Sequence, residues 1–432
     1  MTEVAAAELA RGQRVDLRCG RMVHGGVCLA QADDGAAVLV AGAIPGEVVR
    51  AVLRYRKRST WFADAAEVLE PSPHRVAAPC PYVPECGGCQ LQHIAYDHQV
   101  TLKQEILLDA LRRQGVTPLS EPRVHPMSEP WRYRRRGEFH IVPGADGAAG
   151  AGLGFNRARS WRPIAVDDCI IHEKPITDSL PALRDFVRSE GATAQLATLH
   201  VTLSDERDEL LVQPRPAGAL PQAAVDELAL HLPPRLWLST NGTTLRWRGH
   251  TYRVTSGTFV QVNRTQMETL YGCVLGGLDV RGGRHIADAY AGVGILPVHM
   301  ASLGADVTCI ESNRESARTG VLNARMNDVS ARVRYVLATA EEALPRLAAE
   351  RPFDAVVLDP PRAGCGGTVT GWLALAGPDR VVYASCDVAT LARDLHVLTV
   401  SGPYAIEALD VVDMFPQTYH LETVAVLQRA PA

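Results

Sequence analysis

Two glycines and two acids in the last third of the chain could bind a nucleotide. The segment RHIADAYAGVGILPVHMASLG predicts a buried strand, a glycine turn and a helix, with Asp288 at the end of the strand. Gly292 and Gly294 would let a ligand approach the backbone closely, although the third glycine of a dinucleotide fingerprint is missing. The next predicted strand, ADVTCIESN, ends in Glu311, where a carboxylate can bind both hydroxyls of a ribose. The alternative role for Glu311 is to cap the following helix.

The later predicted strands also end in side chains that could do chemistry. FDAVVLDPPRAG ends a buried strand in Asp359, and its two prolines keep a helix from starting at once. DRVVYASCDVATLARDL delivers Cys386 at a strand end, and HLETVAVLQR carries Glu422. Ligands of doubly wound sheets bind at the carboxyl ends of the strands. These three side chains are therefore expected to meet Asp288 and Glu311 in one cleft.

A second set of reactive residues lies in CPYVPECGGC, which places Cys80, Cys86 and Cys89 within ten residues. The N-terminus does not resemble a signal peptide, so the expected compartment is the cytoplasm, where reduced thiols disfavour a disulfide. Structural zinc sites usually pair a CxxC with a second CxxC or HxxxH. One CxxC and two isolated thiols, the fourth being Cys169, suit a 4Fe–4S cluster better. Radical enzymes use CxxxCxxC with an open iron, whereas this spacing is CxxxxxCxxC.

Bulk properties limit the class of protein. A chain of 432 residues that is 47% hydrophobic and 21% charged is typical of a soluble globular protein with two or three domains. It has no run of about 18 apolar residues that would predict a membrane span. The net charge of −4 excludes a uniformly basic protein. Residues 54–60 and 131–140 nevertheless mix arginine or lysine with aromatics, which suits RNA phosphates and stacked bases or, alternatively, two solvated strand faces.

The pattern of elements predicts an α/β protein. Residues 12–70 alternate in hairpins about ten residues long, which predicts a small β-barrel of oligonucleotide-binding type. A helix follows and ends near Gly115, and residues 125–265 read as mainly β with a helix near 178–190. Beyond residue 264, strands and helices alternate as in a doubly wound, Rossmann-like sheet of six or seven strands. The expected domains are residues 1–72, 73–262 and 263–432.

At this point the residues carry a family resemblance. DAYAGVG, ESN, LDPPRAG, YASCDVATLARDL and DMFPQTYHLETVAVL resemble the S-adenosylmethionine-dependent RNA uracil-C5 methyltransferases. Upstream, TFVQVN resembles the FxQVN segment of that family, CPYVPECGGCQLQH with the distant DDCIIHE resembles its iron–sulfur segment, and residues 12–70 resemble its TRAM domain. The resemblance covers nearly the whole chain. Its TRAM and cluster segments make it most similar to the branch that methylates 23S ribosomal RNA.

The resemblance implies a role for each matching residue. Cys386 would add to carbon 6 of uracil, which makes carbon 5 a carbanion able to attack the methyl group, and Glu422 would then remove the proton from carbon 5. The alternatives are a buried structural cysteine and an exposed strand acid. Cofactor contacts are implied for Gln261, Tyr290, Glu311 and Asp359. The cluster would be fully ligated by Cys80, Cys86, Cys89 and Cys169 and would act as a scaffold.

Three positions depart from the family pattern. Ile295 stands where asparagine is frequent, and Thr339 where asparagine or aspartate is frequent, so two cofactor contacts would be lost or made by the backbone. SCDVAT replaces the commoner SCNPAT, so Asp387 places a carboxylate beside the nucleophile, where it either disfavours the thiolate or points away. Cys365, which follows the Asp-Pro-Pro-Arg loop, is the one reserve nucleophile.

Other functions remain open at this stage. A related enzyme could methylate transfer RNA or a cytosine, and defined RNA substrates would separate these activities. A non-catalytic iron–sulfur RNA-binding protein would predict a broken catalytic set, yet Cys386 and Glu422 are both present. The expected partner is RNA with its target uridine in a loop or flipped out of the stack, since a paired base cannot present carbon 6 to a thiol. No membrane partner is expected, and the chain is expected to be a monomer.

Overall fold

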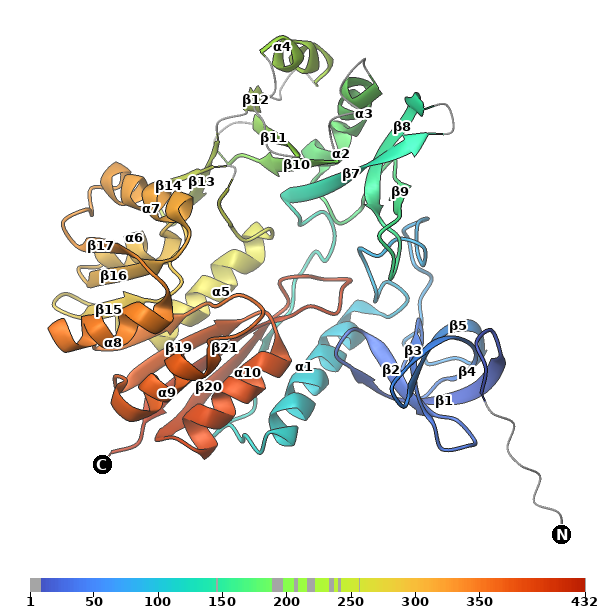
Figure 1. The fold of residues 1–432 in the computed structure, drawn as a ribbon, viewed down its shortest axis with the longest axis horizontal. Coiled ribbons are helices and arrows are strands. Elements are labelled where there is room, and N and C mark those ends of the chain that lie inside the picture. Colours follow the sequence, from blue (N-terminus) through green and yellow to red (C-terminus); the bar gives the residue numbers. More distant parts are fainter. Residues whose placement is uncertain are drawn as a thin grey trace. The chain divides into compact units, whose positions relative to one another are not determined.

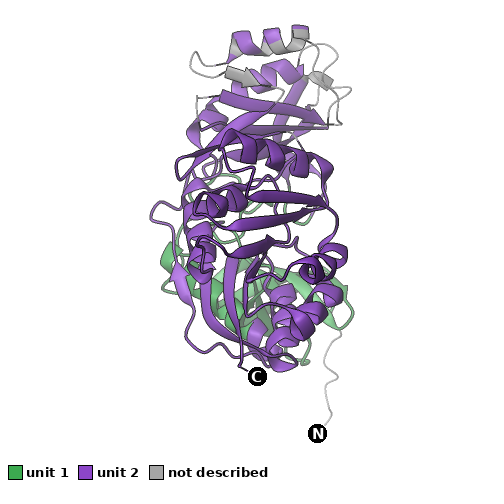
Figure 2. Cartoon of the chain, turned by 90° about the vertical axis from the view of Figure 1, so that its left-hand side faces the viewer, with its two compact units in different colours: residues 1–109, 157–159, 415–420 green, residues 110–156, 160–414, 421–432 purple. Residues whose placement is uncertain are grey.

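A computed structural model provides the structure of the protein. It describes residues 9–144, 147–188, 197–205, 209–215, 222–232, 237–239, 242–255 and 257–431. Its backbone contacts divide the chain into two compact units, which Figure 2 colours separately. The barrel unit comprises residues 1–109, 157–159 and 415–420. The larger unit comprises residues 110–156, 160–414 and 421–432. The domain boundaries expected from the sequence stay a prediction.

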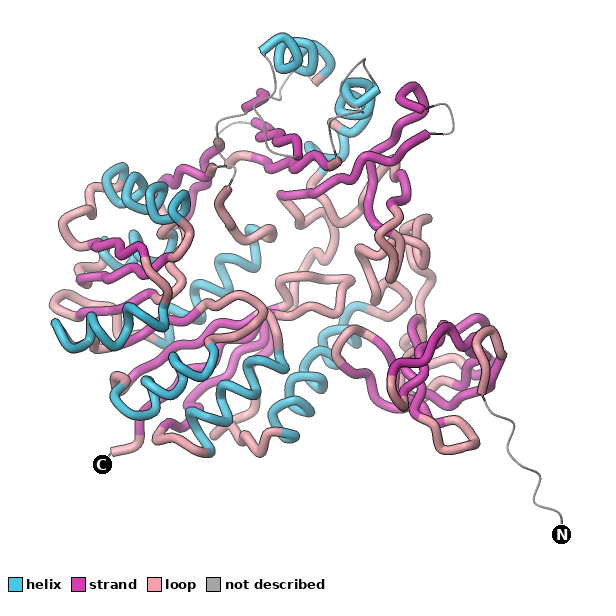
Figure 3. The backbone as a smooth tube through the Cα atoms, in the orientation of Figure 1, coloured by secondary structure: helices cyan, strands magenta, loops and turns pink. Residues whose placement is uncertain are grey.

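The barrel unit is built on a closed five-stranded barrel in the order β1-β2-β3-β5-β4. Figure 3 shows its strands in magenta, next to the N-terminus. Successive side chains of a strand point to opposite faces, so the alternating pattern of β3 sends Val38 and Val40 into the interior, where both are fully buried. This confirms the small β-barrel expected for residues 12–70. The strands are β1 (Arg14–Val23), β2 (Val27–Gln31), β3 (Ala37–Ala41), β4 (Val48–Lys57) and β5 (Thr60–Glu70). Helix α1 (Tyr96–Arg113) follows, and Gly115, with φ of +69°, lies just beyond its end.

In the larger unit, the central part of the chain forms a six-stranded sheet in the order β12-β11-β10-β7-β8-β9. Phe139, Leu199 and Leu183 pack into one core between this sheet and its helices. The mainly-β region with a helix near 178–190 is therefore confirmed. Its strands are β7 (Arg136–Gly144), β8 (Gly147–Asn156), β9 (Pro163–Ala165), β10 (Thr198–Leu203), β11 (Glu209–Arg215) and β12 (Trp237–Ser239). Its helices are α2 (Lys174–Asp178), α3 (Leu180–Arg188) and α4 (Gln222–His231).

The C-terminal part forms an eight-stranded sheet in the order β17-β16-β15-β18-β19-β21-β20-β6, which confirms the doubly wound, Rossmann-like prediction. Strands β15 to β19 run parallel, and β21 is antiparallel to both of its neighbours. The strands are β6 (Arg123–His125), β15 (His285–Asp288), β16 (Asp306–Glu311), β17 (Val333–Leu337), β18 (Ala355–Leu358), β19 (Arg380–Ser385), β20 (Tyr404–Val412) and β21 (Glu422–Arg429). A separate hairpin joins β13 (Thr243–Trp247) to β14 (His250–Val254).

Helices cover both faces of this sheet, with α5, α6 and α7 on one face and α8, α9 and α10 on the other (Figure 1). They are α5 (Arg264–Gly277), α6 (Ile295–Ser302), α7 (Arg314–Met326), α8 (Ala340–Glu350), α9 (Gly366–Ala376) and α10 (Val388–Leu395), followed by the π-helix η1 (His396–Val400). Strand β6 was not expected, because it is three residues long and pairs with β20, almost 290 positions later in the chain. Among the described residues, no helix is long and apolar enough to cross a membrane.

Candidate active site

The candidate site lies at the carboxyl ends of the parallel strands, where the strand order reverses between β15 and β18. Asp288 ends β15, and Asp359 directly follows β18. Burial raises the pKa of Asp288 to about 7, and the nearby carboxylate of Asp359 adds to that rise. Burial likewise raises the pKa of Asp359 to about 6. Two acids at the switch point of the sheet therefore hold protons unusually tightly, as ionisable groups at functional sites often do.

The glycine turn after β15 meets the end of β16 through Glu311. One oxygen of the Glu311 carboxylate accepts a hydrogen bond of 2.8 Å from the Gly292 N–H, and the other accepts one of 2.6 Å from the Asn313 N–H. Gly292, at φ +53°, faces open space, so a ligand can approach its backbone. A Cβ on Gly294 would lie 2.5 Å from the hydroxyl oxygen of Tyr335, which explains the second glycine. Glu311 is thus fixed by backbone donors beside an accessible turn.

Cys386 and Glu422 lie side by side on neighbouring strands. The antiparallel register of β19 and β21 pairs Ser385 with Thr423, and Cys386 and Glu422 are each the next residue beyond that pair. Burial raises the pKa of Cys386 to about 12, and the charges of Glu422 and Asp359 contribute to the rise. A thiol and a carboxyl group at adjacent strand ends are an arrangement able to perform nucleophilic addition and then proton removal.

The protonation of Glu422 is set by its surroundings. Its side chain is almost fully buried, and burial, reinforced by Asp359, holds its pKa well above the usual range. The guanidinium of Arg362 acts in the opposite direction on both Glu422 and Cys386. Arg362 was not among the residues predicted for the site. The signal for it was its place in the Asp-Pro-Pro-Arg turn, directly after a strand end that was expected to face the cleft.

Gln261 and Asn263 belong to the segment that leads into α5. Asn263 caps α5 by accepting a hydrogen bond of 3.1 Å from the Gln266 N–H, and its side-chain amide donates to the carbonyl of Met414 at 3.0 Å. Gln261 is 3% exposed, yet its Oε1 finds no hydrogen-bond partner among the described residues. A buried acceptor without a donor is costly, so this atom is suited to receive a hydrogen bond from a ligand.

Tyr290 lies at the same end of the sheet but is directed towards Cys365, which interacts with its hydroxyl. Cys365 is fully buried, and burial raises its pKa to about 12. The Asp394 carboxylate accepts hydrogen bonds from the Cys365 N–H at 2.9 Å and from the Tyr383 hydroxyl at 2.7 Å. This packing makes Cys365 a structural residue and argues against its reserve role as a nucleophile.

The three departures from the family pattern have structural explanations. Asp387 caps α10, since its carboxylate accepts hydrogen bonds of 3.0 Å from the N–H groups of Ala389 and Thr390. It therefore points to the start of the helix. Thr339 caps α8 by accepting from the Glu342 N–H at 3.4 Å. Ile295 is buried at the first turn of α6, and its apolar side chain has no polar group to offer to a cofactor.

The four cysteines predicted to hold a cluster are divided between the two units. Cys80, Cys86 and Cys89 belong to the barrel unit and are half-buried. Burial raises the pKa of Cys86, and the neighbouring thiol of Cys80 adds to the rise. Cys169 belongs to the larger unit, where its carbonyl accepts a hydrogen bond of 3.2 Å from Arg132. The four-cysteine site consequently stays a prediction.

The two basic segments differ in how far they face solvent. In residues 54–60, Arg56 and Lys57 are exposed, and Tyr55, 43% exposed, stacks on Phe62 with ring centroids 4.7 Å apart. In residues 131–140, by contrast, Arg135 is buried in an ion pair with Asp205 at 2.5 Å. Another arginine of that segment, Arg132, pairs with Asp168 at 2.6 Å. The first segment offers a surface suited to RNA, whereas much of the second is internal.

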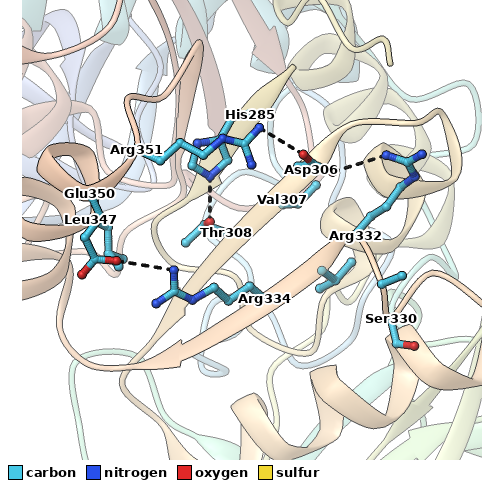
Figure 4. Close-up of a pocket in the computed structure, with 12 residues that line it drawn as sticks. His285, Asp306, Val307, Thr308, Ser330, Arg332, Arg334, Leu347, Glu350 and Arg351 are labelled. Atoms are coloured by element: carbon cyan, nitrogen blue, oxygen red, sulfur yellow. Dashed lines mark hydrogen bonds and ion pairs between the residues drawn. The ribbon is translucent and has the colours of Figure 1, made fainter. Parts of the chain in front are cut away.

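A hollow of about 410 Å³ lies at the opposite edge of the sheet, by the amino ends of β15, β16 and β17 (Figure 4). Its cations are engaged with acids on its own wall: Arg351 pairs with Asp306 at 3.0 Å, and Arg334 with Glu350 at 3.5 Å. Ligands of doubly wound sheets bind at the carboxyl ends, so this hollow is separate from the candidate active site.

Comparison with known proteins defines first the class and then the family. A solved structure of the Pyrococcus abyssi tRNA (uracil-54, C5)-methyltransferase has the same fold, with a TM-score of 0.74 and 24% identity over 96% of this chain and 99% of that one. The sequence profile of the tRNA (uracil-5-)-methyltransferase family matches residues 240–430. The class is therefore that of RNA methyltransferases with a Rossmann-like catalytic sheet.

Full-length relatives extend the match. An uncharacterised RNA methyltransferase of Gloeobacter violaceus is 33% identical over 99% of both chains. The 23S rRNA (uracil(1939)-C(5))-methyltransferase RlmD of Alkalilimnicola ehrlichii is 32% identical over 92% of both chains. This protein belongs to the RNA uracil-C5 methyltransferase family.

Proposed function

We propose that this enzyme transfers a methyl group from S-adenosylmethionine to carbon 5 of a uridine in 23S ribosomal RNA. The observation that carries the proposal is the placement of Cys386 and Glu422 one residue beyond the paired ends of β19 and β21, beside Asp359. The choice of ribosomal RNA draws on the Alkalilimnicola relative, whose name gives uracil 1939 of 23S rRNA as its target.

Several residues fit the cofactor. S-adenosylmethionine supplies an electrophilic methyl group on a sulfonium. The Glu311 carboxylate, held by the Gly292 N–H, is proposed to accept hydrogen bonds from both ribose hydroxyls, which its fixed position supports. Asp288 and Asp359, whose pKa values burial raises to about 7 and about 6, favour a positively charged ligand. The unpartnered Oε1 of Gln261 supplies a further acceptor. Tyr290 is proposed to belong to the same site through its position after β15 rather than through its hydroxyl.

The proposed mechanism uses two side chains in sequence. The Cys386 thiolate forms a bond to carbon 6 of uracil, and the electrons of the ring double bond move towards the carbonyl, so carbon 5 becomes nucleophilic. After methylation, the Glu422 carboxylate accepts the proton from carbon 5, and the bond between carbon 6 and sulfur breaks to restore the ring and the thiol. Burial raises the pKa of both groups, and Arg362 opposes that rise and so favours the ionised form that each step needs.

The RNA is proposed to bind through the barrel unit. Arg56 and Lys57 are exposed cations for backbone phosphates, and the exposed ring of Tyr55 offers a stacking surface. The target uridine must be unpaired or flipped, because a stacked, paired base hides carbon 6. The enzyme is proposed to act as a monomer, which light scattering of the free protein would test.

We also propose that Cys80, Cys86, Cys89 and Cys169 hold a 4Fe–4S cluster. Thiolates are the usual ligands of such clusters, and one CxxC with two isolated thiols fits this use better than a structural zinc site. The cluster would hold the cysteine segment and supply no step of methyl transfer. Anaerobically purified protein should contain ~4 iron atoms and ~4 sulfides per chain. Stoichiometric zinc with no iron would contradict this assignment.

The function is tested by mapping 5-methyluridine in ribosomal RNA from cells that lack the gene. One uridine of 23S rRNA should lose its methyl group, and the purified enzyme should restore it on the unmodified RNA. Parallel assays on transfer RNA and on cytosine-containing substrates address the alternative targets. Methylation of transfer RNA alone would overturn the proposed substrate while leaving the reaction intact.

A further inference from the structure

We propose that His125, Cys273 and Asp410 form a zinc-binding site that is separate from both the active site and the predicted cluster. They come from three elements of the larger unit: β6, α5 and β20. Among the residues that the structure describes, their potential ligand atoms all lie within 4.8 Å of one another. A thiol, an imidazole and a carboxylate together are a typical donor set for zinc. This inference does not depend on the proposed RNA substrate.

One donor distance already fits a tetrahedral metal centre, and a second would have to widen. Zn–S bonds of ~2.3 Å and Zn–N bonds of ~2.0–2.1 Å place the two donor atoms about 3.5 Å apart at a tetrahedral angle. The Cys273 Sγ lies 3.6 Å from the His125 Nε2. The same Nε2 lies 2.7 Å from an oxygen of Asp410, a separation that would widen by about 0.6 Å around a metal. The ion would replace the proton that His125 and Asp410 share.

The backbone holds these side chains in place. The carbonyl of His125 accepts hydrogen bonds from the Gln266 side chain at 3.0 Å and from the Asp413 N–H at 3.1 Å. The buried carboxylate of Asp410 is oriented by Arg123, whose guanidinium donates two hydrogen bonds of 2.8 and 2.6 Å. Hydrogen bonds of this kind orient metal-bound carboxylates in known sites. The site is thus ordered before a metal binds.

Access and charge are compatible with a metal ion. The His125 side chain is 32% exposed and Cys273 is half-buried, so an ion can reach the site from solvent. Asp410 and a Cys273 thiolate would bring two negative charges to a divalent cation. Arg123 adds one positive charge at contact distance from Asp410, so the three charged groups together would still carry a net charge of −1. Three protein ligands would leave the fourth position for water or a ligand.

The competing explanation is an ion-pair clip that fixes β6 to β20. Arg123, Asp410 and His125 account for such a clip, and it would stabilise a strand of only three residues. In the clip, Cys273 would be a protonated thiol that contacts the same imidazole nitrogen from α5, and burial raises its pKa to about 12. A metal site uses all three side chains as ligands, and it would join α5 to the edge strand β6 and to its neighbour β20.

Zinc binding to the full chain tests the proposal. Wild type and the variants Cys273→Ser and His125→Gln are each titrated with Zn²⁺ in competition with a chromophoric chelator. The three proteins are compared with one another because the cluster cysteines can also bind zinc. Each variant should lose one zinc equivalent or bind it at least ~100-fold more weakly, because a ligand contributes at least as much as a supporting residue. Equal zinc stoichiometry and affinity in all three proteins would overturn the site.

Arg123→Gln separates the metal site from the clip. Arg123 is not a ligand, so its removal should leave the zinc equivalent in place with an affinity changed by less than ~100-fold. If these side chains form only the ion-pair clip, Arg123→Gln should lower the melting temperature. Cys273→Ser should then bind as many zinc equivalents as wild type.

A labelling experiment on wild-type protein avoids any folding defect of the variants. Zn²⁺ should protect the Cys273 thiol from alkylation, measured by mass spectrometry of peptides. Cys386 is the matched control, because it is also half-buried and belongs to another site. Protection of Cys273 without protection of Cys386 supports the proposal, and equal labelling of Cys273 with and without zinc overturns it.

Discussion

The Glu311 carboxylate accepts a hydrogen bond of 2.8 Å from the backbone N–H of Gly292. This bond joins the end of β16 to the glycine turn after β15, the two places that a ribose and its neighbouring groups would contact. The acid is therefore oriented by the protein before a cofactor binds, and binding need not spend free energy on fixing its position. The same contact predicts how this site responds to substitution.

Glu311→Gln should weaken binding of S-adenosylmethionine by ~10–100-fold, the effect of losing hydrogen bonds to a charged acceptor. The carboxylate accepts from both Gly292 and Asn313, whereas a glutamine presents an NH₂ group to one of these donors. Calorimetric titration measures the affinity directly. Glu350→Gln, at the opposite edge of the sheet, is the matched control and should bind the cofactor as wild type does. Equal cofactor affinities in the two variants would show that Glu311 does not bind the cofactor.

Cys386→Ala should reduce methyl transfer by at least ~10³-fold, because the variant lacks the group that activates carbon 5. Cofactor affinity should change little, since the thiol acts on the base. Cys365→Ala is the matched control: that cysteine is buried beside Tyr383 and should affect stability more than rate. Single-turnover transfer of labelled methyl groups to 23S rRNA fragments measures the difference. Substantial transfer by Cys386→Ala would exclude the covalent mechanism.

Glu422→Gln should trap the reaction after methylation. The amide has the shape of the acid but cannot accept the proton of carbon 5, so the bond between Cys386 and carbon 6 should persist. A covalent RNA–protein adduct should then accumulate and be visible by denaturing electrophoresis. Cys386→Ala combined with Glu422→Gln should abolish the adduct. Rapid turnover by Glu422→Gln without an adduct would assign the base to another residue.

Asp387→Asn should leave both stability and rate close to wild type. Asparagine caps a helix about as well as aspartate, so α10 keeps the bonds to Ala389 and Thr390. The rate should change less than ~3-fold, because the carboxylate points to the N–H groups of the helix and burial, not Asp387, is the main cause of the raised pKa of Cys386. Asp387→Ala should lower the free energy of unfolding by about 1 kcal/mol. Denaturant unfolding and methyl-transfer assays check both parts, and a large acceleration in Asp387→Asn would contradict the first.

The sequence was sufficient for the architecture because local signals agreed with the fold. Buried strands that end in Asp288, Glu311 and Asp359 could be recognised from short apolar runs and the turns that follow them. Hairpin spacing was equally informative for the barrel. Strand β6 was missed because three residues carry no periodicity, and its pairing with β20 depends on tertiary contacts. Residues at the ends of strands within strand–turn–helix units were thus predictable, whereas the pairing of a three-residue strand with a distant one was not.

The same limit applies to the sites. The proximity of Cys386 to Glu422 could be expected from strand order, but the capping role of Asp387 and the burial of Arg135 could not be read from composition. An Arg-rich segment looks the same whether its guanidinium groups meet RNA or an internal acid such as Asp205. The grouping of His125 with Cys273 likewise depends on how β6 and α5 pack, and no spacing in the sequence indicates it.

The two acids at the switch point predict an unusual pH dependence of stability. Burial raises the pKa of Asp288 to about 7 and that of Asp359 to about 6, so the folded protein keeps protons that the unfolded chain releases near pH 4. Between about pH 4 and about pH 7 the folded state binds more protons than the unfolded state. The free energy of unfolding should therefore fall as pH rises through this window.

Asp288→Asn should remove the part of this pH-dependent loss of stability that the Asp288 carboxyl group causes. The amide stays neutral at every pH, and its oxygen can still accept a hydrogen bond from the Tyr290 N–H. Between pH 5 and pH 8 the free energy of unfolding of the variant should rise relative to that of wild type by on the order of 2–3 kcal/mol. Asp354→Asn is a control in which stability should depend on pH in the opposite direction. The His285 N–H and Arg284 lower the pKa of Asp354, so the stability that the Asp354 carboxylate contributes is lost as pH falls. Denaturant unfolding at several pH values measures both. Parallel curves for wild type and Asp288→Asn would show that the Asp288 carboxyl group is ionised in the free enzyme across the whole range.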